Sequence, residues 1–245
     1  MNKTYLYPYS AEEARRRNEM SLWRASHKAN LACKEEIELA IGTHFDGTHL
    51  EEGCAEGVIR EYGYKRVQWV LSHTIQQLDW SDRFSQANKE WARQTYIPKD
   101  RAYVTDLIIV SDPAIVDLFA TQFQCAYQEL GLFGPTQCEP NSFEKLDYEG
   151  KVLVLSPDTL KETYWTPQAQ LWYAHDGFGC SPKAIGRSIR CTCLGDGEMT
   201  RWNRTDFVGV LKDEFLPEWA KEKLMELKGQ EQNNDSPAMG GMTME

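Results

Sequence analysis

Hydrophobic and polar positions alternate with helical spacing through the first half of the chain. An apolar stripe runs over residues 22–41, and Gly42 directly after it is expected to end that helix. Ser10 followed by Glu13 predicts the start of an earlier short helix, because serine can cap the backbone N–H three residues on. The same spacing predicts further helices over residues 50–62, 64–78 and 80–94, the last of them capped by Ser81 or Asp82.

The segment after residue 111 carries the clearest helical signal. Asp112 is a helix-capping residue, Pro113 suits the first turn, and Gly131 suits the end of a helix. Between them, apolar residues recur every three or four positions on one face. Residues 5–130 are therefore expected to form a helical domain.

The period changes in the second half. Residues 151–155 form an apolar run typical of a buried strand, and residues 187–203 alternate around a Gly-Asp-Gly turn, which predicts a β-hairpin. An amphipathic helix is expected from Pro217. The whole pattern predicts an α+β fold in which the helical domain precedes a small β-rich domain, barrel-like or hairpin-based, with a C-terminal helix.

Composition sets the boundaries between these parts. Residues 131–148 lose both periods and gain Gly, Pro and Asn, so they are expected to be a linker. The β-rich domain and its helix are then expected over 149–228. The polar residues 229–245 are expected to be a disordered tail.

Charge and cysteine content narrow the functional classes. The chain of 245 residues has a net charge of -10, so direct binding to nucleic acid is not expected. No apolar run reaches the length of a membrane span, and the first residues lack the apolar core of a signal peptide. The seven cysteines are then expected to be reduced thiols in a cytoplasmic protein, without membrane contact.

One stretch of the second half contains possible metal ligands, namely His175, Cys180, Cys191 and Cys193. Zinc-binding cysteines usually come in close pairs such as C-x2-C, whereas Cys191 and Cys193 share one face of an alternating strand. Burial of small apolar side chains explains that spacing more simply. We therefore expect no metal and no other cofactor, and a zinc-stabilised binding module stays an alternative.

Two polar and aromatic clusters are candidates for contacting a partner, although capping and packing would account for the same residues. The first cluster supplies Asp79, Trp80, Asp82, Arg83 and Asn88, and the second supplies Trp202, Asn203, Arg204 and Asp206. By contrast, Arg15–Arg17 are expected on a solvated helix face.

An enzyme is the alternative from another class. A hydrolase or a nucleotide-modifying protein would place its site between the two domains. That hypothesis requires at least two of four side chains to line one pocket: His73, Asp79, Asp82 and His175. No local catalytic motif accompanies these residues, so a non-enzymatic function is expected.

Four ordered blocks, "LWRASHKANLACKEEIELAI", "HFDG", "YGYKRVQWVLSHTIQ" and "DWSDRFSQANKEWA", resemble an uncharacterised bacterial family, domain of unknown function 3849. The resemblance covers about residues 10–125. It implies an accessory protein of conjugative or other mobile elements, acting inside a bacterial cell. Together with the charge of -10, this resemblance predicts a protein that modulates conjugation or host defence by binding a protein partner. The acidic charge suits a basic partner, such as a nucleic-acid-binding protein.

Overall fold

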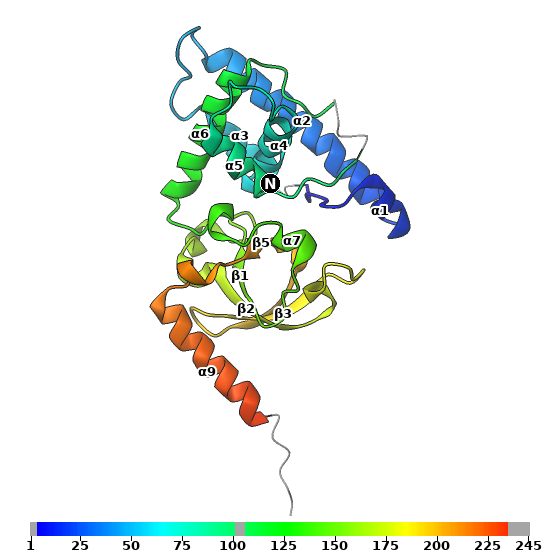
Figure 1. Cartoon of the computed structure of the whole chain (residues 1–245), viewed down its shortest axis with the longest axis vertical. Coiled ribbons are helices and arrows are strands. Elements are labelled where there is room, and N and C mark those ends of the chain that lie inside the picture. Colours follow the sequence, from blue (N-terminus) through cyan, green and yellow to red (C-terminus); the bar gives the residue numbers. More distant parts are fainter. Residues whose placement is uncertain (1–3, 101–105, 235–245) are drawn as a thin grey trace, which may run out of the picture.

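The computed structural model describes residues 4–100 and 106–234 of the chain. The first half is helical, the second half is built around an antiparallel sheet, and a helix follows the sheet (Figure 1). This order of elements confirms the predicted α+β fold. In Figure 1 the helical half lies on one side of the β half, and the C-terminal helix extends from the opposite side.

The helical half packs around one central helix, α4. Four residues close together in α4 are all buried: Val67, Trp69, Val70 and Leu71. Because neighbouring residues of a helix point in different directions, α4 must have neighbours around most of its circumference. Its neighbours are α2, α3, α5 and α6. The helices are α1 (Ala11–Arg16), α2 (Met20–His44), α3 (Cys54–Tyr62), α4 (Tyr64–Gln77), α5 (Gln86–Arg93) and α6 (Pro113–Glu129).

Helix α2 is longer than predicted. It continues past Gly42 to His44, because the backbone becomes extended only at Phe45. At the other end of the predicted apolar stripe, Leu22 is 42% exposed. The buried part of the stripe therefore begins one turn later, at Ser26.

Helix α5 begins later than predicted. The expected cap was Ser81 or Asp82, but the helix begins at Gln86 with Ser85 as its cap. Asp117 of α6 holds Ser85 in place, since its Oδ1 accepts a hydrogen bond from Ser85 N at 3.0 Å. A contact with another helix thus selects among closely spaced capping residues.

The sheet has the strand order β4-β3-β2-β1-β5, with antiparallel neighbours. The predicted hairpin over 187–203 is confirmed, because β3 and β4 pair from Ser188 opposite Asn203. Strand β5 does not extend this hairpin but pairs with β1 at the other edge. The strands are β1 (Val152–Leu155), β2 (Leu171–Asp176), β3 (Ser188–Cys193), β4 (Met199–Asn203) and β5 (Phe207–Val210).

The two faces of the sheet have different cover. Ile189, Cys191 and Cys193 of β3 point into one core, as their alternation predicts. The C-terminal helix α9 (Glu218–Asn234) packs on the other face with its first turns, where Ala220 is buried. This helix continues beyond residue 228, and the remainder of the expected tail, 235–245, lies outside the described residues.

Residues 131–148, expected to be a linker, are packed against the sheet. Cys138 and Tyr148 are buried, and Cys138 forms an isolated bridge with Leu211. The segment therefore contributes to the core of the β half. The remaining short elements are α7 (Ser142–Lys145), α8 (Pro167–Gln170) and the 3-10 helices η2 (Pro135–Gln137), η3 (Glu162–Tyr164), η4 (Phe178–Cys180), η5 (Arg204–Asp206) and η6 (Asp213–Phe215).

Candidate functional site

The first turn of α4 is capped by a side chain from the β half. Asp158 follows β1, and its Oδ1 accepts from Tyr64 N at 2.9 Å while its Oδ2 accepts from Lys65 N at 2.7 Å. The local N-cap is Gly63, which has φ +84° and no side chain to offer. A Cβ on Gly63 would lie 2.7 Å from Asp158 Oδ1. The glycine therefore makes room for a carboxylate that satisfies the exposed N–H groups of the helix.

Lys65 makes a second bond between the halves in the same turn. Its ammonium group donates to the carbonyl oxygens of Thr205 and Phe207, the latter at 3.2 Å. Burial lowers the pKa of Lys65, although the carboxylates of Asp206 and Asp158 oppose this effect. The start of α4 is thus fixed to the segment after β1 and to the start of β5.

An acidic groove of about 640 Å³ lies beside this cap, between α3, α6 and residues 157–165. Ile59, Leu130 and Trp165 supply much of its apolar wall. Trp165 is held in position because its Nε1 donates to Pro157 O at 3.1 Å. Its charged lining consists of the carboxylates Glu56, Glu129, Asp158 and Glu162 and the cations Arg60 and Lys161.

The carboxylates act together on Tyr64 at the base of this acidic groove. Burial raises the pKa of the Tyr64 phenol, and the negative charges of Asp158 and Glu56 raise it further, followed by those of Glu129 and Glu162. All four carboxylates disfavour the ionised form of this phenol, so the electrostatic potential at Tyr64 is negative. The groove is therefore suited to a cationic group attached to an apolar stem.

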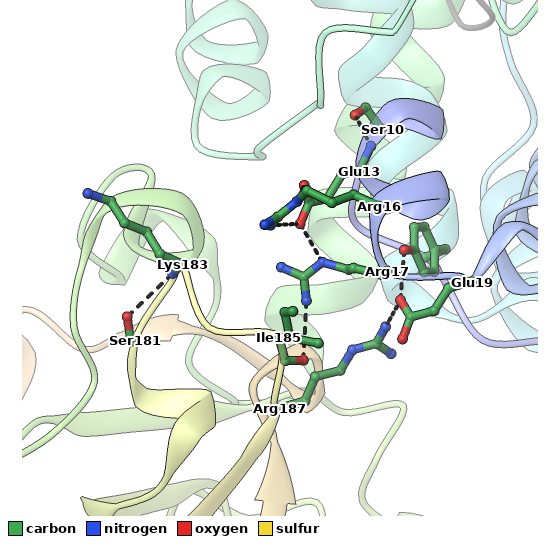
Figure 2. A network of polar contacts seen from close by, with 10 residues as sticks. Ser10, Glu13, Arg16, Arg17, Glu19, Ser181, Lys183, Ile185 and Arg187 are labelled. Atoms are coloured by element: carbon green, nitrogen blue, oxygen red, sulfur yellow. Dashed lines mark hydrogen bonds and ion pairs between the residues drawn. The ribbon is translucent and has the colours of Figure 1, made fainter.

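A separate polar network joins α1 to the loop before β3 (Figure 2). Arg17 donates to Ile185 O at 3.3 Å, and Arg187 pairs with Glu19. Arg15 and Arg16 are exposed, as expected, whereas the Arg17 side chain is only 2% exposed and also bonds Glu13. The expected solvated position is therefore wrong for Arg17 alone, because this residue lies at the turn after α1 and contacts the loop before β3.

The first predicted contact cluster is mostly used within the helical half. Asp79 accepts two hydrogen bonds of 3.0 Å from Arg93, and Arg83 pairs with Asp112. Asn88 is buried and donates to Asp117 Oδ1 at 2.7 Å. Of this cluster, Trp80, at 79% exposure, and Asp82 project to the surface.

The second predicted cluster forms a structural corner. Arg204 is 2% exposed, so it cannot belong to an exposed recognition edge. Its guanidinium donates to main-chain carbonyls and lies 3.6 Å from the centre of the Tyr148 ring. Trp202 packs edge-on against Trp172. Asp206 closes the turn by accepting from Asn203 N at 2.8 Å.

The possible zinc ligands are not brought together. His175 Nε2 lies 2.6 Å from Thr192 Oγ1, on the face of the sheet opposite Cys191. Burial raises the pKa of Cys191 to about 12, which favours the neutral thiol over a metal-binding thiolate. Within residues 4–100 and 106–234, no three His, Cys, Asp or Glu side chains gather as metal ligands.

The four side chains of the enzyme hypothesis do not share the acidic groove. His73 is buried beside Trp69 in α4, whereas Asp79 is paired with Arg93 outside that core. Asp82 is exposed, and His175 lies on the sheet. None of them lines the acidic groove.

Among the helices that the structure describes, none is both long and apolar enough to cross a bilayer.

Sequence reasoning missed the residues of the acidic groove. Glu56, Glu129 and Glu162 look like ordinary solvated charges, because nothing near them in sequence marks a site. One signal was present: Gly63 separates two helices without any capping side chain, which indicates a cap from elsewhere in the chain.

Comparison with known proteins gives one match. A family model described as "Protein of unknown function (DUF3849)" matches residues 6–128, which correspond to the helical half. No curated protein and no solved structure matches the chain.

Proposed function

Since the chain belongs to the DUF3849 family of proteins of unknown function, we propose that it is a non-enzymatic protein-binding module. Its acidic groove would take a segment rich in Lys and Arg from a partner protein. The proposed setting is the bacterial cytoplasm, where the chain is an accessory protein of a mobile element and acts on conjugation or host defence.

The charge and shape of the acidic groove carry this proposal. Four carboxylates and two cations line it, so a cationic segment gains attraction there. Trp165 and Leu130 offer apolar surface for the aliphatic stems of Lys and Arg side chains. The Asp158 cap connects both halves at the base of the groove, so the two walls are held in a fixed relation.

The class of partner follows from the same charges. A net charge of -10 repels a nucleic-acid backbone, whereas it attracts a protein that itself binds nucleic acid through a basic surface. Such an acidic module would compete with nucleic acid for that surface. This competition is the mechanism that we propose for an effect on conjugation or defence.

Charge reversal on the walls of the groove tests the proposal. Glu129→Lys combined with Glu162→Lys changes two exposed groove residues and leaves the Asp158 cap intact. We expect loss of a partner captured from the host cell and identified by mass spectrometry. We also expect about tenfold weaker binding of a synthetic Lys/Arg-rich peptide from that partner, measured by fluorescence anisotropy.

The matched control is Glu35→Lys combined with Glu198→Lys. Both residues are exposed and lie outside the groove, and the change in net charge is the same. This control should retain partner and peptide. Equal losses in the two double variants would show that only total charge matters, and undiminished binding in the groove variant would also contradict the proposal.

A further inference from the structure

A second hollow lies between the halves, is lined in part by Lys65, and shares no lining residue with the acidic groove. We call it the inner chamber, and its volume is about 110 Å³. Its aromatic walls are Trp69, Tyr96 and Phe143. The rings of Tyr96 and Phe143 are stacked, with their centres 6.1 Å apart and their planes at 24°. Flat aromatic walls favour a flat ligand.

The N-terminal segment closes one side of the inner chamber. Leu6 and Pro8 line it, while the alternate residues Tyr5, Tyr7 and Tyr9 lie beside the guanidinium of Arg187. Alternation along an extended segment therefore gives it one face toward the chamber and one toward the arginine. The chamber is thus built from five segments of the chain, residues 6–8, 65–69, 94–96, 135–143 and 205–208.

Side-chain amides line the edges of the inner chamber. Gln68 donates to Thr95 Oγ1 at 2.8 Å, which fixes its amide plane. The buried Gln94 Oε1 has no hydrogen-bond partner among the described residues. The side chain of Asn141 makes no capping hydrogen bond to α7, which follows it. Each amide carries both donor and acceptor groups, so together they suit a ligand edge of mixed polarity.

Asn141 also has an unusual backbone conformation. Its φ is 55°, in the left-handed region that residues other than glycine rarely adopt. It stands where the inner chamber adjoins a larger outer chamber of about 410 Å³, and both chambers share Thr95, Tyr96 and Asn141 as walls. Asn141 therefore borders both chambers.

The charges around both chambers nearly balance. The inner chamber has Lys65, which is already bonded to two carbonyls, and Glu139. The outer chamber has Arg93, Lys99 and Glu144, and Arg93 is paired with Asp79. Neither an anion nor a cation gains strong net attraction, so the chambers suit a neutral ligand.

We propose that the inner chamber binds a neutral six-membered heteroaromatic ring with amide-like edges, the chemistry of a pyrimidine base. The inner chamber, at about 110 Å³, is smaller than an engineered apolar cavity of about 150 Å³ that accommodates benzene, so it can take at most one ring and no fused pair, and groups on that ring would lie outside it. A substituent on the ring, such as a sugar, would extend into the outer chamber. This site is separate from the acidic groove and does not depend on the function proposed for it.

Uracil, uridine and adenine are the probes. We expect saturable binding of uracil and uridine, detected by saturation-transfer NMR of the ligand and by a change in tryptophan fluorescence from Trp69. Adenine should bind at least tenfold more weakly, because its fused rings exceed the inner chamber. Adenine binding as tightly as uracil, or no binding of uracil, would overturn the proposal.

Asn141→Gly tests the role of the amide without disturbing the backbone, since glycine accepts φ 55° freely. We expect uracil to bind at least tenfold more weakly to this variant. Asn18→Gly is the matched control, because Asn18 has φ 58° and lies outside both chambers. Equal affinity of the two variants for uracil would contradict the site. The double variant Glu129→Lys, Glu162→Lys should bind uracil as the natural chain does.

Discussion

The burial of Arg204 could not be predicted from the sequence. In the sequence it stands in a polar stretch that is typical of an exposed turn. In the structure its five N–H groups have carbonyl partners on residues 142–146 and 179–180. Arginine is almost never fully buried without such partners. Because these partners are distant in sequence, no local pattern predicts the burial.

Replacing Arg204 should destabilise the fold strongly. Arg204→Met keeps much of the side-chain volume but leaves several buried carbonyl oxygens without a donor. We expect the free energy of unfolding to fall by about 3–5 kcal/mol, measured by urea denaturation. Arg201→Met, on the exposed face of β4, is the control and should change it by about 0.5 kcal/mol or less. Similar losses in both variants would contradict a structural role for Arg204.

At the scale of the element, local capping signals predict a helix start only where the cap is local. Ser10 and Asp112 cap their own helices, as the sequence indicates. At α5, Asp117 of another helix favours Ser85 over the earlier candidates. At α4 the capping carboxylate comes from the other half of the chain. Boundaries fixed by tertiary contacts are therefore the ones that periodicity misplaces.

Two glycine substitutions separate the cap from backbone strain. Gly63 has φ +84° with Asp158 in the way of a Cβ, whereas Gly150 has φ +70° and open space around it. Gly150→Ala should lower the free energy of unfolding by about 1–2 kcal/mol through strain alone. Gly63→Ala should lower it by at least about 1 kcal/mol more, because Gly63, at φ 84° and ψ 161°, lies in a region almost exclusive to glycine and because the new Cβ also displaces the Asp158 cap.

The same pair can be measured in an Asp158→Ala background by chemical denaturation. With the cap already removed, the extra loss at Gly63 should shrink by about 1 kcal/mol, and the part that remains is due to the backbone conformation of Gly63. An extra loss at Gly63 as large as in the natural chain would mean that the Asp158 carboxylate contributes nothing to it.

At the scale of the whole molecule, the fold decides which thiols can react. Burial raises the pKa of Cys33, Cys138 and Cys191 to about 12 and that of Cys54, Cys180 and Cys193 to about 11. Cys125 on α6 is exposed. The reactive thiolate form is therefore scarce at the six buried positions near neutral pH.

Titration with Ellman's reagent at pH 8 should detect one thiol per native chain, and seven after unfolding in guanidinium. Cys125→Ser should abolish the native signal. Raising the pH to 9 should leave the count at one, since that pH is still below the raised pKa values of about 11 and 12. Rapid reaction of a second thiol in the native chain would contradict the buried arrangement.

Periodicity was sufficient for the helices, the hairpin and the order of the two halves. It missed β2, because "LWYAHD" lies directly before a stretch of Gly, Pro and Cys that obscures the alternation. It also could not locate the acidic groove. Glu56, Glu129 and Glu162 belong to three separate elements and meet only through long-range packing. Surface charges that belong to no local motif can be assigned to a site only once the tertiary structure shows that they lie together.

The Asp158 cap has a consequence for folding during synthesis on the ribosome. Tyr64 and Asp158 are 94 residues apart in sequence. At a synthesis rate of about 5–20 residues per second, the central helix waits roughly 5–20 s before its carboxylate partner is made. During that interval the helical half of the nascent chain lacks the Asp158 carboxylate that caps α4. Completion of the sheet, late in translation, is then what locks the earlier half into its mature form.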